Sequence, residues 1–217
     1  MATACDGAGS ASHGWAGAAL AARILSSCAL AHLRYCRDVP DGAQVATWFD
    51  LVRRAIGQAA APRGLCMADF ATTALVAISD GRRTVTAHVG DGAIVACGAR
   101  PDGASGSWTA LSWPEHGEYV SSTFFVTDVD PRLRVARHDD PVDRLVVMTD
   151  GLERLALDFA AGTPHPPFLN GLCRPLTGSA NVGMNAPLSR DLARFLGSEA
   201  VDRRTDDDKT IVVAVLR

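Results

Sequence analysis

The sequence predicts an α+β domain in which helices pack on an antiparallel β core. Two helical patterns come first, six short runs rich in β-branched residues follow, and helical patterns return before a final strand. Turn residues separate the short runs, as they do in antiparallel meanders. The chain has 217 residues, of which 47% are hydrophobic and 21% are charged. This length and composition suit one globular domain with a sizeable core.

The first helix is predicted over residues 14–36, because apolar side chains recur there at helical spacing. Its apolar stripe consists of Ala16, Leu20, Ile24 and Cys28. Polar residues interrupt this run, so we expect neither a membrane-spanning segment nor an export signal. The interrupting residues are Arg23, Ser26, Ser27 and His32. After a turn at 38–42, a second helix is predicted over 45–60, with Trp48, Phe49, Val52 and Ile56 on its buried face.

The predicted strands follow once the spacing of apolar residues changes after Gly64. They cover residues 72–78, 84–89, 93–97, 107–113, 123–127 and 144–148. Helical patterns return at 152–159 and 188–196, and the run KTIVVAVL predicts a last strand. The whole order indicates one layered domain.

Charge and cysteine usage exclude several classes of function. The net charge of −3 provides no basic surface for nucleic acid or for an anionic membrane. The six cysteines show no CxxC pair and no regular spacing. We therefore expect reduced, mostly buried thiols in place of a zinc site or a disulfide framework, and a cytoplasmic protein.

Asp-Gly pairs occur six times, and most of them are explained as turns. Asp150 differs, because in RLVVMTDGLERLAL a buried strand leads through it into a helix with almost no loop. The same construction appears at Asp6, where ATAC precedes Asp-Gly and a helix follows. A helix N-cap is the alternative explanation for one such aspartate, but it does not explain both.

A third acidic feature, Asp206-Asp207-Asp208, directly precedes the last predicted strand. Like charges this close are destabilising unless a cation offsets them, although a solvated acidic loop is the alternative for this run alone. Together with Asp6 and Asp150, the run predicts carboxylates from distant strand ends that converge on one point. Such all-oxygen ligation suits Mg²⁺ or Mn²⁺ better than zinc. A pair of these ions activates water and binds a phosphoryl group.

Five stretches resemble, in order, the signature motifs of the PPM (protein phosphatase 2C) family of metal-dependent serine/threonine phosphatases, in particular its compact bacterial members. The stretches are DGAGS at 6–10, ATTALVAI at 71–78, VGDGAIV at 89–95, TDGLERL at 149–155 and DDKT at 207–210. Together they cover nearly the whole chain. The resemblance implies a β-sandwich of antiparallel sheets flanked by helices, in four layers (αββα).

The same resemblance implies roles for individual residues. Asp6 would bridge two metal ions, with the Gly7 carbonyl beside one of them, and Asp150 and Asp207 would complete one ion's shell. These three aspartates are the predicted catalytic residues. Asp91 matches the position that touches a more loosely held third ion in bacterial members. Asp208 replaces the family's asparagine, so we assign it no ligand role.

The sequence also departs from the family pattern. Ala8 stands where many members have a histidine; His13 is the candidate substitute, and an ordinary surface histidine is the alternative. In the family, the strand carrying the second metal's acidic ligand would precede Met1. We therefore expect residues 1–217 to form a single domain that is incomplete at its N-terminus. The stretch 98–122 is expected to influence which phosphoprotein is accepted.

The implied function is hydrolysis of phosphoserine and phosphothreonine through a water activated by two Mn²⁺ or Mg²⁺ ions, with a third ion at Asp91. The expected partners are a phosphorylated protein substrate and the serine/threonine kinase that modifies it, with the chain itself a monomer. The alternative is an impaired relative that binds a phosphoprotein or a kinase without turnover.

Overall fold

The strands of the computed structural model, which describes residues 1–99, 105–115 and 123–216, form two antiparallel sheets and a short ribbon. The first sheet has the order β1-β2-β3-β6 and consists of β1 (Ala2–Ala4), β2 (Ala74–Ser79), β3 (Thr84–Val89) and β6 (Arg134–His138). The second has the order β10-β7-β4-β5 and consists of β10 (Ile211–Val215), β7 (Val142–Met148), β4 (Ala93–Ala99) and β5 (Ser105–Ser112). The ribbon pairs β8 (Leu157–Asp158) with β9 (Thr163–Pro164).

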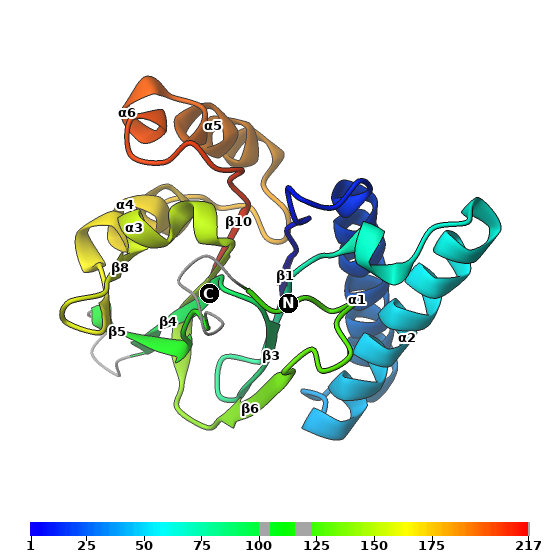
Figure 1. The fold of residues 1–217 in the computed structure, drawn as a ribbon. Coiled ribbons are helices and arrows are strands. Elements are labelled where there is room, and N and C mark those ends of the chain that lie inside the picture. Colours follow the sequence, from blue (N-terminus) through cyan, green and yellow to red (C-terminus); the bar gives the residue numbers. More distant parts are fainter. Residues whose placement is uncertain (100–104, 116–122, 217) are drawn as a thin grey trace.

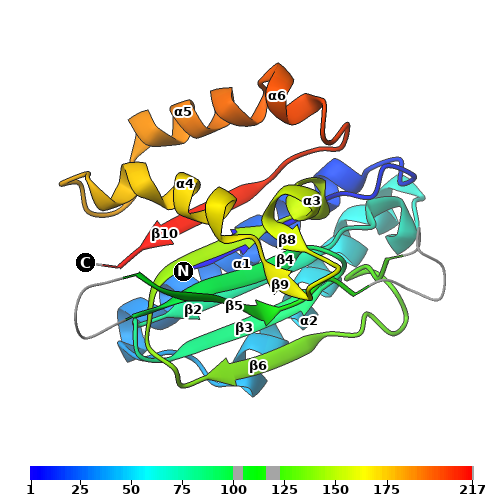
Figure 2. The same ribbon diagram turned by 90° about the vertical axis from the view of Figure 1, so that its left-hand side faces the viewer.

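Helices cover both outer faces of this sandwich (Figure 1, Figure 2). On the first sheet lie α1 (Gly14–Cys36) and α2 (Gly42–Ala60). On the side of the second sheet lie α3 (Glu153–Ala156), α4 (Pro166–Thr177), α5 (Ala186–Leu196) and α6 (Glu199–Asp202). Short 3₁₀ turns are η1 (Ala61–Arg63), η2 (Met67–Phe70) and η3 (Asp150–Leu152).

Three apolar cores join the four layers. The core between the first sheet and its helices includes Leu25, Ile56 and Val76. The core between the sheets includes Leu75, Ile94 and Val147, and the core beneath α3 and α4 includes Met148, Leu152 and Leu169. Because neighbouring strand residues point to opposite faces, a strand covered on both sides is apolar throughout. The four-layer αββα architecture implied by the resemblance is confirmed.

The strand predicted at 123–127 is wrong, and β6 takes its place in the first sheet. In the segment 123–127, the backbone of Val126 donates one hydrogen bond to the Thr72 carbonyl, and the Phe125 N–H donates to the Asp128 carboxylate in a turn. Strand β6 escaped prediction because RVARH has no alternating apolar residues. It is an edge strand of the first sheet, and its residues are half-buried or exposed, so it needs no alternating apolar side chains.

The helical pattern at 152–159 corresponds only to the short α3, after which the chain turns into β8. Helix α4 was not predicted, because prolines at 166, 167 and 175 lower its helical propensity. It forms because Leu169 and Cys173 are fully buried on the second sheet. The helix predicted over 188–196 is confirmed as α5, and the two N-terminal helices are confirmed as α1 and α2.

By length and composition α1 could cross a membrane, since it has 23 residues and a mean hydropathy of 1.4 in its most apolar window. Packing against the rest of the domain also requires small and apolar residues on one face of α1. Gly17, Ala21, Leu25 and Ala29 are buried where the helix packs. Only 22% of that window is buried, so α1 packs through one face, and a single helix of this kind is weak evidence for a membrane span.

The cysteine prediction is confirmed in part. All six cysteines are free thiols. Only Cys97 and Cys173 are buried, whereas Cys36 and Cys66 are exposed, so the expectation of mostly buried thiols is wrong.

Candidate metal centre

Asp6 follows β1 and is held through its backbone by two threonines at the start of the ATTALV stretch. The Asp6 N–H donates to Thr73 Oγ1 at 3.1 Å, and the Asp6 carbonyl accepts from Thr72 Oγ1 and from the Thr73 N–H, both at 2.8 Å. Gly7 forms a bridge with Thr72 directly afterwards. The threonines of this motif therefore fix the backbone that carries Asp6 and the Gly7 carbonyl.

Strand register brings the other aspartates to the same end of the sandwich. The first residue of β4, Ala93, and the first residue of β10, Ile211, both pair with Met148 near the end of β7. Asp91 lies just before β4, and Asp150 lies just after β7. Antiparallel pairing thus places the start of two strands and the end of a third side by side.

A second contact holds the DDKT segment against Asp150. The Thr149 N–H donates to the Thr210 carbonyl at 3.0 Å, and the Thr210 N–H donates to Thr149 Oγ1 at 3.1 Å. A Cβ on Gly151 would lie 2.2 Å from the Asp208 carbonyl oxygen. Only glycine permits this approach, which brings Asp207 beside Asp150.

Replacing Gly151 with alanine is expected to destabilise the chain by about 2–3 kcal/mol, because backbone atoms cannot yield to the new methyl group. Urea unfolding measures this loss. The matched control is Gly171→Ala in α4, where a Cβ meets nothing within 4 Å and alanine favours the helix. Equal stabilities of the two variants would contradict the assigned packing of the DDKT segment.

The carboxylates perturb one another strongly. Burial, together with the negative charges of Asp150 and Asp207, raises the pKa of Asp6 to about 7. Burial and the charges of Asp91 and Asp207 raise the pKa of Asp150 to about 6. Burial and repulsion by neighbouring carboxylates both favour the protonated form of a carboxyl group. Asp150 therefore lies within electrostatic reach of Asp6, Asp91 and Asp207.

Glu153 is a member of this group that sequence analysis missed. Burial and the charges of Asp150 and Asp91 raise its pKa to about 7, and its Oε2 atom is buried without a hydrogen-bond partner. A glutamate three residues after Asp150 lies one helical turn further on, and that spacing was the available signal. We call Asp6, Asp91, Asp150, Glu153, Asp207 and Asp208 the acidic cluster. Asp206 is exposed.

His13 lies at the N-cap of α1 without capping it through its side chain. Its ring stacks on Phe70 with 5.3 Å between centroids, and its Nδ1 lies 2.9 Å from Ser12 Oγ. These contacts explain the histidine as a packed residue of the α1–η2 junction, and the structure adds no catalytic contact to it.

The acidic cluster has the donors that a hard divalent cation requires. Among residues 1–99, 105–115 and 123–216, no three His, Cys, Asp or Glu side chains already form a closed set of ligands. The cluster nevertheless fits such an ion in two respects. Its donors are oxygen atoms only, and one of them, Glu153 Oε2, is buried and unpaired.

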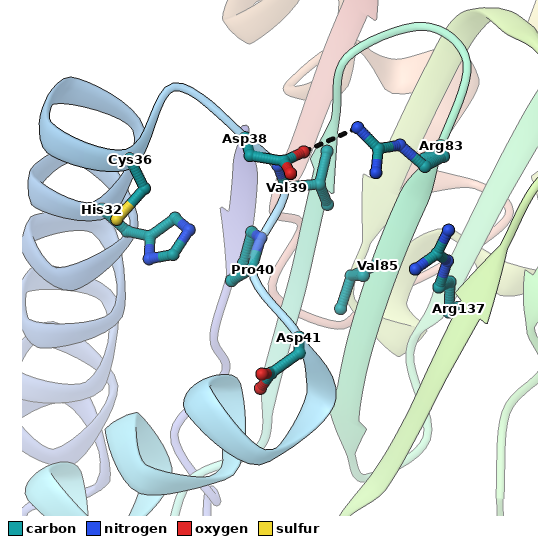
Figure 3. A pocket seen from close by; sticks show the side chains of 9 residues that line it. All are labelled: His32, Cys36, Asp38, Val39, Pro40, Asp41, Arg83, Val85 and Arg137. Atoms are coloured by element: carbon teal, nitrogen blue, oxygen red, sulfur yellow. Dashed lines mark hydrogen bonds and ion pairs between the residues drawn. The ribbon is translucent and has the colours of Figure 1, made fainter.

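A cavity of about 450 Å³ lies at the other end of α1 and contains none of the predicted site residues (Figure 3). Arg83 reaches it from the turn just before β3, Arg137 from the edge strand β6, and His32 from α1. Its charges are compensated, because Arg83 pairs with Asp38 at 2.6 Å and with Asp80 at 3.3 Å. This cavity therefore holds no part of the predicted metal site.

Comparison with known proteins identifies relatives of this chain. A family model described as protein phosphatase 2C matches residues 1–197. Serine/threonine-protein phosphatase 3 of Escherichia coli (strain K12) is 33% identical over an alignment of 220 residues that covers 97% of this chain and 81% of the relative.

Solved structures share the fold at lower sequence identity. The serine/threonine phosphatase Stp1 from Staphylococcus aureus has a TM-score of 0.60 at 16% identity, covering 99% of this chain and 83% of its own. The catalytic domain of the serine/threonine phosphatase PstP in complex with two manganese ions has a TM-score of 0.59 at 16% identity, covering 99% and 87%. At these identities the likeness establishes the fold.

Proposed function

This chain belongs to the protein phosphatase 2C family, and we propose that it hydrolyses phosphoserine and phosphothreonine in proteins with divalent metal ions held by the acidic cluster. The observation that carries the proposal is the convergence of carboxylates from separate strand ends at one end of the sandwich, where burial and neighbouring carboxylates raise the pKa of Asp6, Asp150 and Glu153. Repulsion between carboxylates from separate strand ends lowers the stability of the fold. Their grouping is therefore better explained by the binding of a cation.

The residues proposed to hold the metal are Asp6, the Gly7 carbonyl, Asp91, Asp150 and Asp207, and the ions are Mn²⁺ or Mg²⁺. The chemistry that two such ions supply, when bound, is activation of water and neutralisation of charge on the phosphoryl oxygens. The threonine pair at 72–73 keeps the Asp6 backbone fixed.

The substrate, the kinase that modifies it, the oligomeric state and the cellular location are part of the same proposal. A phosphatase acts on phosphorylated proteins, and we propose that a serine/threonine kinase produces this substrate. We also propose that residues 1–217 act as one domain, as a monomer and in the cytoplasm. Parts of the 98–122 stretch expected to select substrates, residues 100–104 and 116–122, lie outside the described residues.

Hydrolysis of an aryl phosphate by the purified chain tests the function. We expect turnover with Mn²⁺ that EDTA abolishes, because the proposed nucleophile is a water that the metal ions activate. A phosphothreonine peptide should be hydrolysed under the same conditions. Absence of turnover from a well-folded chain would contradict the proposal and support the non-catalytic alternative, in which the cluster only helps to bind a phosphoprotein.

A further inference from the structure

Arg134, the first residue of β6, joins three segments that lie next to Asp91. Its Nη1 donates to the Trp113 carbonyl at 2.8 Å, just beyond β5. Its Nη2 lies 2.9 Å from His88 Nδ1 and 3.4 Å from the Gly90 carbonyl oxygen. One planar guanidinium group therefore contacts β3, the β3–β4 turn and the chain that leaves β5.

Glu115 completes this arrangement from the same chain that leaves β5. Its Oε2 lies 2.9 Å from Arg134 Nε, and its Oε1 lies 3.7 Å from Arg132 Nη1. The Glu115 N–H donates to the Gly90 carbonyl at 3.4 Å. The carbonyl that precedes Asp91 is thus held by both members of the Arg134–Glu115 pair.

His88 provides a neutral partner inside the sandwich. It faces Arg134 in the β3–β6 register, and its Nδ1 also lies 2.8 Å from Ser112 Oγ of β5. Burial, together with the charge of Arg134, lowers the pKa of His88 well below its usual value. The neutral ring therefore accepts a hydrogen bond from Arg134 at Nδ1.

Gly90 is fixed from its other side by a threonine that also holds Asp6. Its φ of +115° lies in the region that favours glycine, and a Cβ there would lie 2.6 Å from Thr73 Cγ2. Thr73 Oγ1 accepts the hydrogen bond from the Asp6 N–H. The backbone before Asp91 is consequently clamped between Arg134 and the residue that holds Asp6.

We propose that Arg134 is a positioning residue that, through the Gly90 carbonyl and Glu115, fixes Asp91 relative to Asp6. The proposal rests on the proposed function, because it gives Asp91 a metal to bind. The residues that Arg134 contacts, Trp113, His88, Gly90 and Glu115, are not among those proposed to bind metal. The contribution of Arg134 is to hold the turn in the geometry that Asp91 needs before the metal arrives.

The first test is a double-mutant cycle on Mn²⁺ binding, measured by titration calorimetry with the full chain. Arg134→Met and Asp91→Asn should each weaken binding of the most weakly held ion by roughly tenfold. If Arg134 acts through Asp91, the double variant binds Mn²⁺ no more weakly than Asp91→Asn alone. Additive losses would overturn the proposal, because independent sites add.

The second test needs no metal. In Arg134→Met, amide hydrogen exchange at residues 90–92 and 113–115 should accelerate roughly tenfold in the metal-free chain. The matched control is Arg137→Met on the same strand, whose guanidinium pairs with the exposed carboxylate of Asp139. Unchanged exchange in Arg134→Met, or equal changes in both variants, would overturn the proposal.

Two further variants distinguish a role of the planar guanidinium group from a role of its charge and from a folding defect. Arg134→Lys retains the charge without the planar group, so it should restore only part of the Mn²⁺ affinity. If Arg134→Met does not fold, Glu115→Gln removes the opposite charge and should raise exchange at 90–92 in the same direction. Absence of Mn²⁺ binding by the unmodified chain would contradict the proposed function, while the exchange result in metal-free protein would still decide whether Arg134 fixes the turn.

Discussion

Replacing Asp150 with asparagine is expected to lower Mn²⁺-dependent hydrolysis of an aryl phosphate by on the order of a thousandfold or more. The substitution removes one negative charge from the acidic cluster and changes almost no volume. The fold should survive it, because the Gly151 N–H donates to Asp150 Oδ1 at 2.9 Å and an amide oxygen can accept the same bond. Relief of repulsion should leave the metal-free variant as stable as the unmodified chain, or slightly more so.

The control for this experiment is an aspartate outside the cluster. Asp139 is exposed and pairs with Arg137 at 2.8 Å, so Asp139→Asn should leave turnover unchanged. Asp102, which sequence analysis also assigns no chemistry, lies outside the described residues. Normal activity in Asp150→Asn would contradict the assignment of Asp150 to a metal, whatever the family relationship.

The aspartates could be predicted from the sequence because each stands at the end of a strongly apolar strand. A buried strand that delivers Asp150 straight into a helix is visible in the letters alone, and the Asp6 segment repeats it. Antiparallel pairing then brings such ends together without any long-range information beyond the strand order. The sequence alone therefore predicts which aspartates lie next to strand ends.

The supporting residues could not be predicted in the same way. Glu153 looks like a surface helix residue until α3 packs its first turn against the cluster. The roles of Thr72 and Thr73 depend on hydrogen bonds to Asp6, across 66 residues of chain. Arg134 belongs to an edge strand with no apolar alternation. All of these roles arise from tertiary contacts that local propensity does not encode.

The metal-free chain is expected to lose more stability between pH 5 and pH 8 than its Asp6→Asn variant. Asp6 has a folded pKa of about 7 against an ordinary value of 3.8, so the folded state holds a proton that the unfolded state has released. Stability therefore falls as the pH rises from about 4 through 7. Asp150 and Glu153 act in the same direction, because burial and neighbouring charge raise their pKa values too.

Comparison with the variant is needed because buried histidines act in the opposite direction. Burial lowers the pKa of His88 and of His138, so these residues cost stability as the pH falls below about 6.5. Both proteins carry the two histidines, and their contribution cancels in the difference. Allowing for solvent screening of a half-buried group, we expect Asp6 to account for about 1–2 kcal/mol, or roughly 3–6 °C in Tm.

Thermal unfolding at pH 5, 6, 7 and 8 in EDTA measures this difference, and the same series with Mn²⁺ gives its counterpart. A cation binds only the ionised cluster, so Mn²⁺ should raise the Tm of the unmodified chain most at pH 8 and least at pH 5. Asp6→Asn should show a flatter pH profile and a much smaller response to Mn²⁺. Parallel profiles for the two proteins in EDTA would mean that Asp6 is not repelled by its neighbours, and the case for a cation between these strand ends would lose its electrostatic basis.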